Sequence, residues 1–361
     1  MKIDFVISSL TSGGAERVVA NLANYFAEKG HQVRVMTFSK VEDSYGLHKS
    51  IKRERYDKQY FIFNFTSVKC LLFLLSFYFK KRNRPDIISS HATLMGYATI
   101  LISKLYNIKL TVSEHTNHFR GKNAIGNRLI WNYLYRFPEA VTVLTKYDLP
   151  FFQSKNKNAL VIHNPCSFKP IQNIEDEREK VILAVGNIDR YKIKGFDNLL
   201  DVASKVLPKH RDWRLKIVGA GNQGLLFLKE KALNLNIIEQ VVFTGYRSDV
   251  NNLMKNSEIF VLSSRFEGLP MGLMEAMSQG MACIAYDCVS GPSEIITNEF
   301  NGILVENQNQ DKLADTLNLL IENKEIRTSL RKNSVNSLEK FSIDNVGSKW
   351  ENLFQKLILE N

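Results

Sequence analysis

The sequence has few cysteines, no long apolar run and no internal repeat. Its four cysteines lack CxxC spacing and sit in apolar stretches, which indicates reduced core residues of a cytoplasmic protein, with neither a disulfide framework nor a zinc motif. The apolar part of residues 68–79 falls short of the ~20 residues that a helix needs to cross a bilayer. Residues 1–7 carry a charge inside a short apolar run, which predicts a first strand rather than a signal peptide.

Acidic residues are outnumbered by basic ones. Lys and Arg number 48 against 37 Asp and Glu, a net charge of +11 at neutral pH. This balance favours anionic partners, which are phosphates, an acidic membrane surface or nucleic acid. A nucleic-acid-binding protein has no recognised motif to support it here, so we expect no nucleic-acid partner. A length of 361 residues with ordinary globular composition suggests two domains.

The first residues read as a strand, a helix and a second strand. Residues 3–8 form a compact apolar run, apolar residues then repeat at helical spacing over residues 18–26, and residues 33–38 form the next strand. Such a unit predicts a parallel sheet. Gly13 and Gly14 lie at the first strand-to-helix turn, where paired glycines either allow close approach of a ligand or simply make a tight turn.

Residues 61–65 are a candidate third strand, and residues 68–79 predict a helix that is apolar nearly all round. A basic cluster follows this helix, and its members are Lys80, Lys81, Arg82 and Arg84. One interpretation is a core crossover helix. The other, which we favour, adds contact with an anionic membrane surface, because interfacial helices have this composition.

A second stretch, residues 127–137, also mixes aromatic and basic residues. Trp131, Tyr135 and Arg136 would form a face for lipid or for an acceptor. A solvated helix with an apolar inner face would have a similar pattern.

Histidines follow two further strands of the expected sheet. His91 ends the strand at residues 86–90, and His115 comes just after the strand at residues 110–113. Ligands of open α/β sheets bind at the carboxyl ends of the strands. His91 is interpreted as a structural histidine, and His115 as a candidate site residue.

A polar segment at residues 170–180 marks a domain boundary, and a new series of strands begins at residue 181. Gly219, Gly221 and Gly224 then form a GxGxxG pattern after a strand, which alone suggests a dinucleotide site. A complete strand–helix unit precedes it, and no acidic residue ends a clear next strand. An NAD-linked oxidoreductase is therefore kept only as the alternative.

The most informative stretch follows the apolar strand at residues 258–262. A Gly/Pro turn leads into a helix that starts near Pro270, so a helix N-terminus points into the crevice, as in anion sites. Glu267 lies in the turn, and Glu275 follows after seven residues on a mostly apolar helix. A buried carboxylate needs hydrogen-bond donors, and ribose hydroxyls would supply them.

This Glu-x7-Glu pattern, within Phe-Glu-Gly-Leu-Pro and Met-Glu-Ala-Met, resembles the donor-site signature of the retaining family 4 glycosyltransferases. The resemblance implies the GT-B architecture, in which two Rossmann-like α/β domains with parallel sheets face each other across a cleft. We expect an acceptor-binding domain over residues 1–168 and a nucleotide-sugar-binding domain over residues 178–340. The last residues, 341–361, would form a helix that crosses back to the first domain.

The resemblance also assigns site residues. Glu267 would face the transferred sugar, Glu275 the ribose, and Lys194 the leaving diphosphate, while His115 would hold the sugar. The family usually has Arg at the position of Asn187, so whether Arg190 or Lys192 provides the second cation stays open. The remaining donor-binding candidates are Gly13, Gly14, Tyr246, Arg247, Gly268, Leu269, Pro270 and Met271.

We therefore expect a retaining, metal-independent glycosyltransferase that uses no cofactor. It would move an N-acetylhexosamine or hexose from a nucleotide-sugar, with a UDP-sugar as the expected donor, to a lipid-linked oligosaccharide in cell-surface glycan assembly. The resemblance extends to bacterial N-acetylgalactosaminyl transferases of this kind, which implies a peripheral position on the inner face of the cytoplasmic membrane. A GT-B nucleotide-sugar epimerase shares the fold but lacks support from the Glu-x7-Glu pattern.

Overall fold

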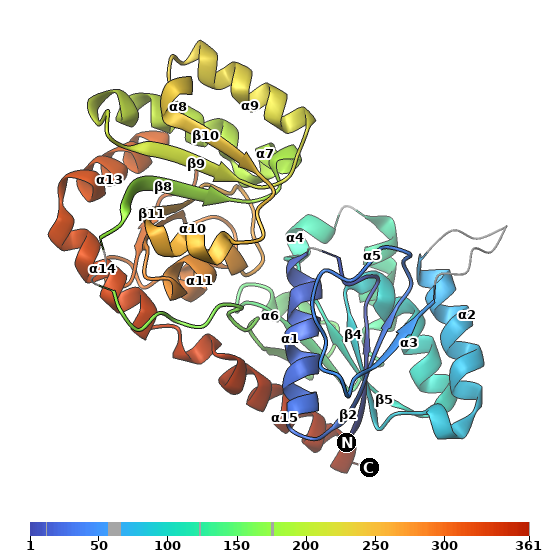
Figure 1. Cartoon of the computed structure of the whole chain (residues 1–361). Helices are drawn as coiled ribbons and strands as arrows, with labels where there is room; N and C mark the ends of the chain where they lie inside the picture. Colours follow the sequence, from blue (N-terminus) through green and yellow to red (C-terminus); the bar gives the residue numbers. More distant parts are fainter. Residues whose placement is uncertain (12, 57–65, 123, 175–176, 361) are drawn as a thin grey trace. The chain divides into compact units, whose positions relative to one another are not determined.

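The computed structural model describes residues 1–11, 13–56, 66–122, 124–174 and 177–360. The chain forms two compact units, drawn in Figure 1. The first comprises Met1–Ser167 with Phe341–Asn361, and the second is Phe168–Lys340. The expected strand at residues 61–65 lies outside the described residues.

The sheet of the first unit has seven parallel strands in the order β3-β2-β1-β4-β5-β6-β7. The strand order reverses between β1 and β4, which creates the kind of crevice where open α/β sheets bind ligands. The strands are β1 (Lys2–Val6), β2 (Gln32–Thr37), β3 (Lys52–Arg55), β4 (Ile87–His91), β5 (Lys109–Ser113), β6 (Ala140–Val143) and β7 (Ala159–Val161).

Helices cover both faces of this sheet, because successive strand residues point to opposite sides. Phe5 of β1 packs on Phe26 of α1 (Gly14–Glu28), and Phe26 stacks on Phe354 of α15 (Ile343–Leu359). The last helix of the chain thus belongs to the first unit, beside α1 (Figure 1). Val6 faces the other way, into a core shared with α2 (Thr66–Phe79) and α3 (Thr93–Tyr106). Short helices complete the unit: α4 (His118–Gly121), α5 (Ile125–Leu129) and α6 (Leu149–Gln153).

The second unit has a six-stranded parallel sheet in the order β10-β9-β8-β11-β12-β13. Its strands are β8 (Glu179–Val185), β9 (Arg214–Val218), β10 (Val241–Gly245), β11 (Ser257–Leu262), β12 (Ala282–Tyr286) and β13 (Ile303–Val305). Figure 1 shows α8 (Phe196–Val206) and α9 (Gln223–Asn234) on one face, with α10 (Val250–Asn256) and α11 (Met271–Ser278) on the other. The other helices are α7 (Tyr191–Lys194), α12 (Pro292–Ile295), α13 (Gln310–Glu322) and α14 (Lys324–Asn336). Both units are therefore α/β structures built on parallel sheets, as expected.

Helix α2 is only partly buried. Its inner side places Cys70, Leu74 and Tyr78 in the core. Its outer side leaves Phe79 76% exposed, with smaller exposed areas on Leu72 and Leu75. Both expected features, core packing and an apolar outer side next to the basic cluster, are thus present in one helix. Among the described residues, no helix combines the length and apolarity that a bilayer crossing requires.

The expected aromatic face of residues 127–137 is wrong in its members. Trp131 and Tyr135 are buried in the core of the first unit, where both donate hydrogen bonds to Glu114. A π-helix at residues 130–134 follows α5 and shifts which side chains point inward. The exposed apolar side chains of this region are Ile125, Leu129, Tyr133 and Phe137.

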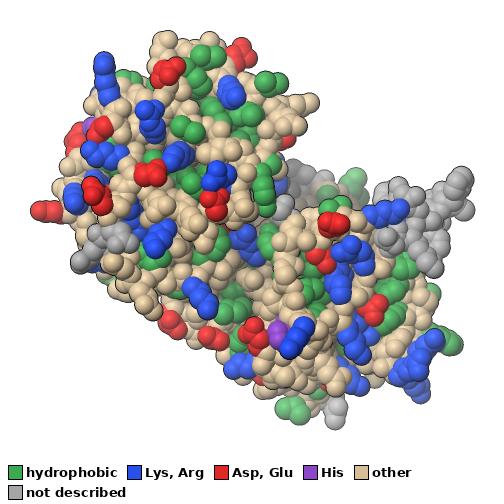
Figure 2. Space-filling view, viewed as in Figure 1, with side chains coloured by type: hydrophobic (Ala, Val, Ile, Leu, Met, Phe, Trp, Pro, Cys, Tyr) green, Lys and Arg blue, Asp and Glu red, His purple; other side chains and the backbone are tan. Residues whose placement is uncertain are grey.

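Basic side chains are spread over both units. On the face shown in Figure 2, Lys and Arg alternate with acidic and hydrophobic side chains and form no single basic stripe among the described residues. A nucleic-acid-binding domain typically gathers its Lys and Arg on one face. The view in Figure 2 gives no support to that function.

Candidate active site

The candidate donor site lies at the carboxyl-terminal edge of the sheet in the second unit. The loops that leave β8, β9, β10 and β11 all emerge at this edge, because the four strands are parallel neighbours. Predicted site residues stand on the loops after β8, β10 and β11. The topology therefore gathers residues that are far apart in the sequence.

Lys194 and Glu267 form an ion pair at the centre of this edge. The Nζ atom of Lys194 lies 2.8 Å from Oε1 of Glu267. The Ser264 hydroxyl donates to the same carboxylate oxygen at 2.6 Å. Lys194 is 25% and Glu267 12% exposed, so the charges are partly shielded from water but still reachable by a ligand. The two residues that resemblance assigns to the diphosphate and the sugar are thus direct neighbours.

Gly195 allows the Lys194 loop to lie directly against the loop after β11. It has φ of +68°, a left-handed conformation that favours glycine. A Cβ atom at this position would also overlap the carbonyl oxygen of Ser263. The Ser263 hydroxyl donates to the Lys194 carbonyl at 2.8 Å. The Lys-Gly pair therefore has a packing reason as well as a charge.

Arg265 clamps the same two loops together. Its guanidinium donates to both carboxylate oxygens of Asp197, at 2.7 and 3.0 Å, and to Asn198 at 2.7 Å. It also donates to the Lys192 carbonyl. A bidentate guanidinium–carboxylate pair is among the strongest hydrogen-bonded contacts in proteins. We did not predict Arg265 as a site residue. Its position between Ser264 and Phe266, within the signature, could have indicated it.

The turn at residues 267–271 is held by the loop after β12. Ser290 donates to the Glu267 carbonyl at 2.9 Å. Gly291 has φ of +99°, and a Cβ atom there would overlap the Gly268 carbonyl. Helix α11 begins at Met271 after Pro270, with Leu269 buried beneath the turn. The predicted helix start is correct, so the N-terminal amides of α11 carry their partial positive charge at this edge.

Glu275 lies on α11, where only 6% of it is exposed. Its flanking residues Met274 and Ala276 are fully buried. The expectation of a carboxylate on a mostly buried helix is therefore correct. A carboxylate in such surroundings favours ligands that donate hydrogen bonds.

The GxGxxG stretch packs against the backbone of the neighbouring loop. A Cβ at Gly219 would overlap the Gly186 carbonyl, and one at Gly224 would overlap the Ile188 carbonyl. The amides of Asn222 and Gly224, at the start of α9, both donate to the Asp189 carboxylate at 2.9 Å. In a dinucleotide site, amides at this position would donate to the pyrophosphate. Here they donate to Asp189 instead. Tight packing accounts for the glycines, and the NAD alternative loses its support.

Three other candidates stand on neighbouring loops with accessible side chains. Arg190, after β8, is exposed. Tyr246, after β10, is 67% exposed, which leaves its ring free to stack on a flat ligand. Arg247 is paired with Asp249 through two bonds of 2.8 and 2.7 Å. Arg247 therefore already has a local partner, and a ligand would have to compete with Asp249 for its guanidinium.

The first unit places Gly13, Gly14 and His115 at the carboxyl-terminal edge of its own sheet. Gly13 precedes α1 and accepts a hydrogen bond from the Tyr45 hydroxyl at 3.1 Å. The Glu16 carboxyl lies over Gly13, and a Cβ atom there would have to displace it. Burial raises the pKa of Glu16. The glycine pair thus forms the amino end of α1, beside a carboxyl whose pKa is raised.

His115 is bound to a second histidine that sequence reasoning interpreted as structural. His91 Nδ1 and His115 Nε2 are 2.8 Å apart, and the rings are stacked. Burial lowers the pKa of His91 and lowers the pKa of His115 to about 4, so both rings are neutral at pH 7, and one of them donates the hydrogen bond that joins the two. His115 Nδ1 is buried without a hydrogen-bond partner among the described residues. Ala92, next to His91, has φ of +75°, a strained conformation of the kind that clusters at functional sites.

Glu114 anchors the loop that carries His115. Its carboxyl accepts hydrogen bonds from Thr93 at 2.8 and 2.9 Å, from Trp131 at 3.4 Å and from Tyr135. Burial raises the pKa of Glu114 to about 7, although these donors oppose the shift. The carboxyl is buried and its oxygens are bound by Thr93, Trp131 and Tyr135, so it holds the loop in place. In the described part of the chain, no group of three or more His, Cys, Asp or Glu residues is placed to hold a metal ion.

Two known protein families match this chain, one in each half. Residues 12–166 match the family "Glycosyltransferase Family 4", and residues 167–336 match "Glycosyl transferases group 1". An uncharacterized glycosyltransferase of Haemophilus influenzae is 30% identical over 98% of this chain and 99% of its own length.

Two further likenesses extend over nearly the whole chain. A Campylobacter jejuni α-1,4-N-acetyl-D-galactosaminyltransferase, named for the acceptor GalNAc-α-(1->4)-GalNAc-α-(1->3)-diNAcBac-PP-undecaprenol, is 27% identical over 99% of both chains. The crystal structure of Anabaena HepE in complex with UDP superposes with a TM-score of 0.81 at 17% identity, over 99% of this chain and 100% of that one.

Proposed function

This chain belongs to the family 4 glycosyltransferases of GT-B architecture, and we propose that it extends a lipid-linked oligosaccharide with anomeric retention. The donor is a nucleotide-sugar, with a UDP-linked N-acetylhexosamine or hexose as the best candidate. The Campylobacter relative named for a polyprenyl-diphosphate acceptor supports the acceptor class. The complex of Anabaena HepE with UDP supports a UDP-linked donor.

The Lys194–Glu267 pair carries this proposal. The Lys194 ammonium group is bound to Glu267, four residues before the start of α11, and together with the helix amino end it offers positive charge to a leaving diphosphate. Without donor, the Glu267 carboxylate neutralises Lys194 and holds its ammonium group in place. When a diphosphate binds, Lys194 turns to the phosphate oxygens, and Glu267 becomes available to the sugar hydroxyls. Charge neutralisation by Lys194 and the helix amides supports departure of the diphosphate without a metal ion.

The other predicted residues have separate roles in this proposal. Glu275 accepts the ribose hydroxyls, and Tyr246 stacks on the base. His115 Nδ1 is buried and lacks a partner among the described residues, which suits it to bind a sugar hydroxyl. Since the lowered pKa of His115 keeps its ring neutral at pH 7, it meets the sugar as a hydrogen-bonding group and adds no charge.

We further propose that the enzyme works at the inner face of the cytoplasmic membrane. The exposed apolar side of α2 ends at Phe79, directly before the cations Lys80, Lys81 and Arg82. Apolar side chains next to basic ones are typical of interfacial segments. A protein bound there reaches a lipid-linked acceptor while the lipid stays in the bilayer.

A donor and acceptor screen tests the reaction. UDP- and GDP-sugars are offered with and without polyprenyl-diphosphate-linked oligosaccharides, in the presence of a metal chelator, and released nucleotide is measured. We expect release with one UDP-sugar, only when an acceptor is present, and at the same rate with the chelator. Release that needs a divalent metal contradicts metal independence, and loss of donor without nucleotide release favours an epimerase.

A further inference from the structure

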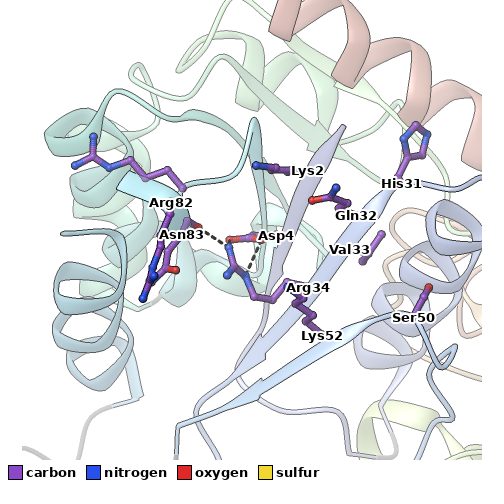
Figure 3. A pocket seen from close by; sticks show the side chains of 11 residues that line it. Lys2, Asp4, His31, Gln32, Val33, Arg34, Ser50, Lys52, Arg82 and Asn83 are labelled. Carbon is purple, nitrogen blue, oxygen red and sulfur yellow. Dashed lines mark hydrogen bonds and ion pairs between the residues drawn. The ribbon is translucent and has the colours of Figure 1, made fainter. Parts of the chain in front are cut away.

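A basic cavity opens at the amino-terminal edge of the sheet in the first unit (Figure 3). It has a volume of about 430 Å³ and is lined by the first residues of β1, β2 and β3 and by the turn before β4. This volume lies within the range of small-molecule sites, about 300–1,000 Å³. Gly13 and His115 lie at the opposite edge, one strand length away, about 16 Å for five residues. The cavity is therefore separate from the candidate active site of this unit.

Cations dominate the lining. The only carboxylate among the described lining residues is Asp4. The basic side chains are those of Lys2, Arg34, Lys52, Arg82 and Arg84. Such an excess of one sign within one concave surface raises the local concentration of counter-ions.

The carboxylate of Asp4 is already neutralised. Arg34 donates to it from Nε at 3.0 Å and from Nη2 at 2.7 Å, and the Tyr78 hydroxyl donates at 2.5 Å. The strand register explains this arrangement, since Asp4, Arg34 and Lys52 are consecutive partners across β1, β2 and β3. Asp4 thus fixes the Arg34 side chain and contributes little repulsion to an incoming anion.

Arg34 keeps donors for a ligand. A guanidinium has five N–H groups. Two bind Asp4 and a third binds the Asn83 carbonyl at 2.6 Å, as the dashed lines in Figure 3 show. The two N–H groups of Nη1 have no acceptor among the residues that the structure describes. Arg34 is 15% exposed, so these donors are held in place and still reach the cavity.

Three other cations of the cavity also lack a carboxylate partner among the described residues. The side chains of Lys2, Lys52 and Arg82 are exposed and form no ion pair within the described ranges. In contrast, Arg53 and Arg55, on the same strand as Lys52, both pair with Asp43, at 2.8 and 3.1 Å. The cations next to the cavity are thus left unpaired where neighbouring cations are neutralised.

Two further polar groups border the cations. His31 lies between the N-terminal amine, at 3.2 Å, and Glu351, at 3.0 Å. Asp86 accepts the backbone N–H of Lys2 at 2.7 Å. The remaining cation of the lining is Arg84. It donates from Nε to the Tyr78 carbonyl at 2.8 Å and lies over the Tyr106 ring, so its position is fixed by the fold.

We propose that this cavity binds a phosphate-bearing anion. A phosphate group offers several acceptor oxygens and a charge that a fixed guanidinium and two lysines match. Arg34 Nη1, Lys2 and Lys52 bind the phosphate oxygens, and Arg82 adds charge at the rim. The same chemistry is supplied by a free phosphate compound or by the headgroup of an anionic phospholipid. The site does not depend on the proposed transfer reaction.

Residue-resolved lysine labelling tests this site in the full chain. The protein is treated with an amine-acylating reagent at ~0.15 M salt, where charges more than about 8 Å apart are largely screened, and the rate at each lysine is read by mass spectrometry. One arm adds inorganic pyrophosphate, a second adds phosphatidylglycerol vesicles, and a third adds phosphatidylcholine vesicles. Lys194 reports the donor site separately, and Lys157, exposed before β7 at the same edge of the sheet, is the internal control.

We expect pyrophosphate to slow acylation of Lys2 and Lys52 at concentrations that leave Lys157 unaffected. Protection by phosphatidylglycerol vesicles but not by pyrophosphate identifies a lipid headgroup as the source, and the reverse identifies a soluble compound. Lys52→Glu and Arg82→Glu weaken protection of Lys2 about tenfold or more, whereas Lys157→Glu leaves it unchanged. Equal labelling of Lys2 with and without both probes, or equal protection of Lys157, overturns the proposal.

Discussion

The ammonium group of Lys194 lies 2.8 Å from the carboxylate of Glu267, although 73 residues separate them in the sequence. Lys194 ends α7 after β8, and Glu267 follows β11. Since β8 and β11 are adjacent and parallel, both loops leave the sheet at the same edge. The ion pair is thus a direct product of the strand order, and it joins the residues proposed to bind diphosphate and sugar.

Lys194→Ala lowers turnover far more than it lowers stability. The lost charge acts mainly while the diphosphate departs, so we expect kcat to fall by about a hundredfold or more, with a smaller change in KM. Steady-state kinetics at saturating donor without added metal measure this effect. Lys205→Ala, which removes an exposed partner of Asp311 in the same unit, is the control. Activity of the Lys194 variant within twofold of the parent would falsify the assignment.

Gly195→Ala disturbs the site through the backbone. Gly195 has φ of +68° and no room for a Cβ against Ser263, whereas Gly30 has φ of +82° with open space around it. Gly30→Ala therefore suffers only backbone strain, about 1–2 kcal/mol. We expect Gly195→Ala to be less stable than Gly30→Ala in urea unfolding and, unlike it, to bind donor more weakly. Equal effects of both substitutions would show that the contact with Ser263 is unimportant.

Glu275→Gln weakens donor binding while the fold survives. A carboxylate that accepts ribose hydroxyls forms charge-assisted hydrogen bonds, each of about 1.5–3 kcal/mol. We expect calorimetry to show at least a tenfold weaker Kd for the nucleotide-sugar. Glu325→Gln, at an exposed position of α14, is the matched control. A nucleotide-sugar affinity equal to that of the parent contradicts the ribose assignment.

Glu114 makes stability depend on pH. The folded state raises its pKa from 4.5 to about 7, so the unfolded chain releases this proton first as pH rises. The folded state therefore loses stability between pH 4.5 and pH 7, by up to roughly 3 kcal/mol from this group. Gln resembles the protonated carboxyl and does not titrate.

Comparison of urea unfolding for the parent and Glu114→Gln isolates this contribution. We expect the variant to gain stability relative to the parent as pH rises through this window. His115 contributes with the opposite sign in both proteins, since its lowered pKa destabilises the fold as pH falls from 6.5 to about 4. The contribution of His115 therefore cancels when the free energies of unfolding of the two proteins are subtracted. A difference that is constant with pH contradicts the raised pKa of Glu114.

Reversal of Lys80, Lys81 and Arg82 to Glu abolishes attraction to anionic membranes. Each cation near such a surface contributes about 1 kcal/mol, and salt screens this attraction. Arg84 is kept, because its guanidinium binds the Tyr78 carbonyl. Reversal of three exposed lysines of the second unit, Lys229, Lys255 and Lys324, is the control.

Vesicle co-sedimentation with and without phosphatidylglycerol, at low and high salt, measures the effect. We expect only the first variant to lose lipid-charge-dependent binding. If vesicle binding of the parent does not depend on lipid charge or salt, α2 only packs in the core and the membrane proposal fails.

The sequence predicted the strand, turn and helix around Glu267 and Glu275 well because these signals are local. The strand at residues 258–262, the Gly/Pro turn and the apolar helix around Glu275 each follow from a few consecutive residues, and β11 and α11 occupy these positions. The glycine pattern at residues 219–224 was ambiguous in the sequence. Its explanation lies in backbone packing against Gly186 and Ile188, which no local pattern reveals.

Contacts between distant residues were beyond sequence reasoning. The expected face of Trp131 and Tyr135 failed because a π-helical turn points these rings inward to Glu114. We interpreted His91 as an ordinary structural histidine. Its contact with His115 links residues at the ends of two different strands, and no local pattern in the sequence reveals it. The basic cavity likewise requires the register of β1, β2 and β3, which brings Asp4, Arg34 and Lys52 into one row.

The anomeric form of the product is the sharpest test of the proposed reaction. The protein is incubated with the matched UDP-sugar, whose sugar is α-linked, and a polyprenyl-diphosphate-linked oligosaccharide, and the product is analysed by mass spectrometry and NMR. We expect an acceptor heavier by one sugar residue, joined through an α-glycosidic bond, and loss of this product with Lys194→Ala. A β-linked product, or a donor sugar that is isomerised and never joined to the acceptor, would contradict the proposed transfer.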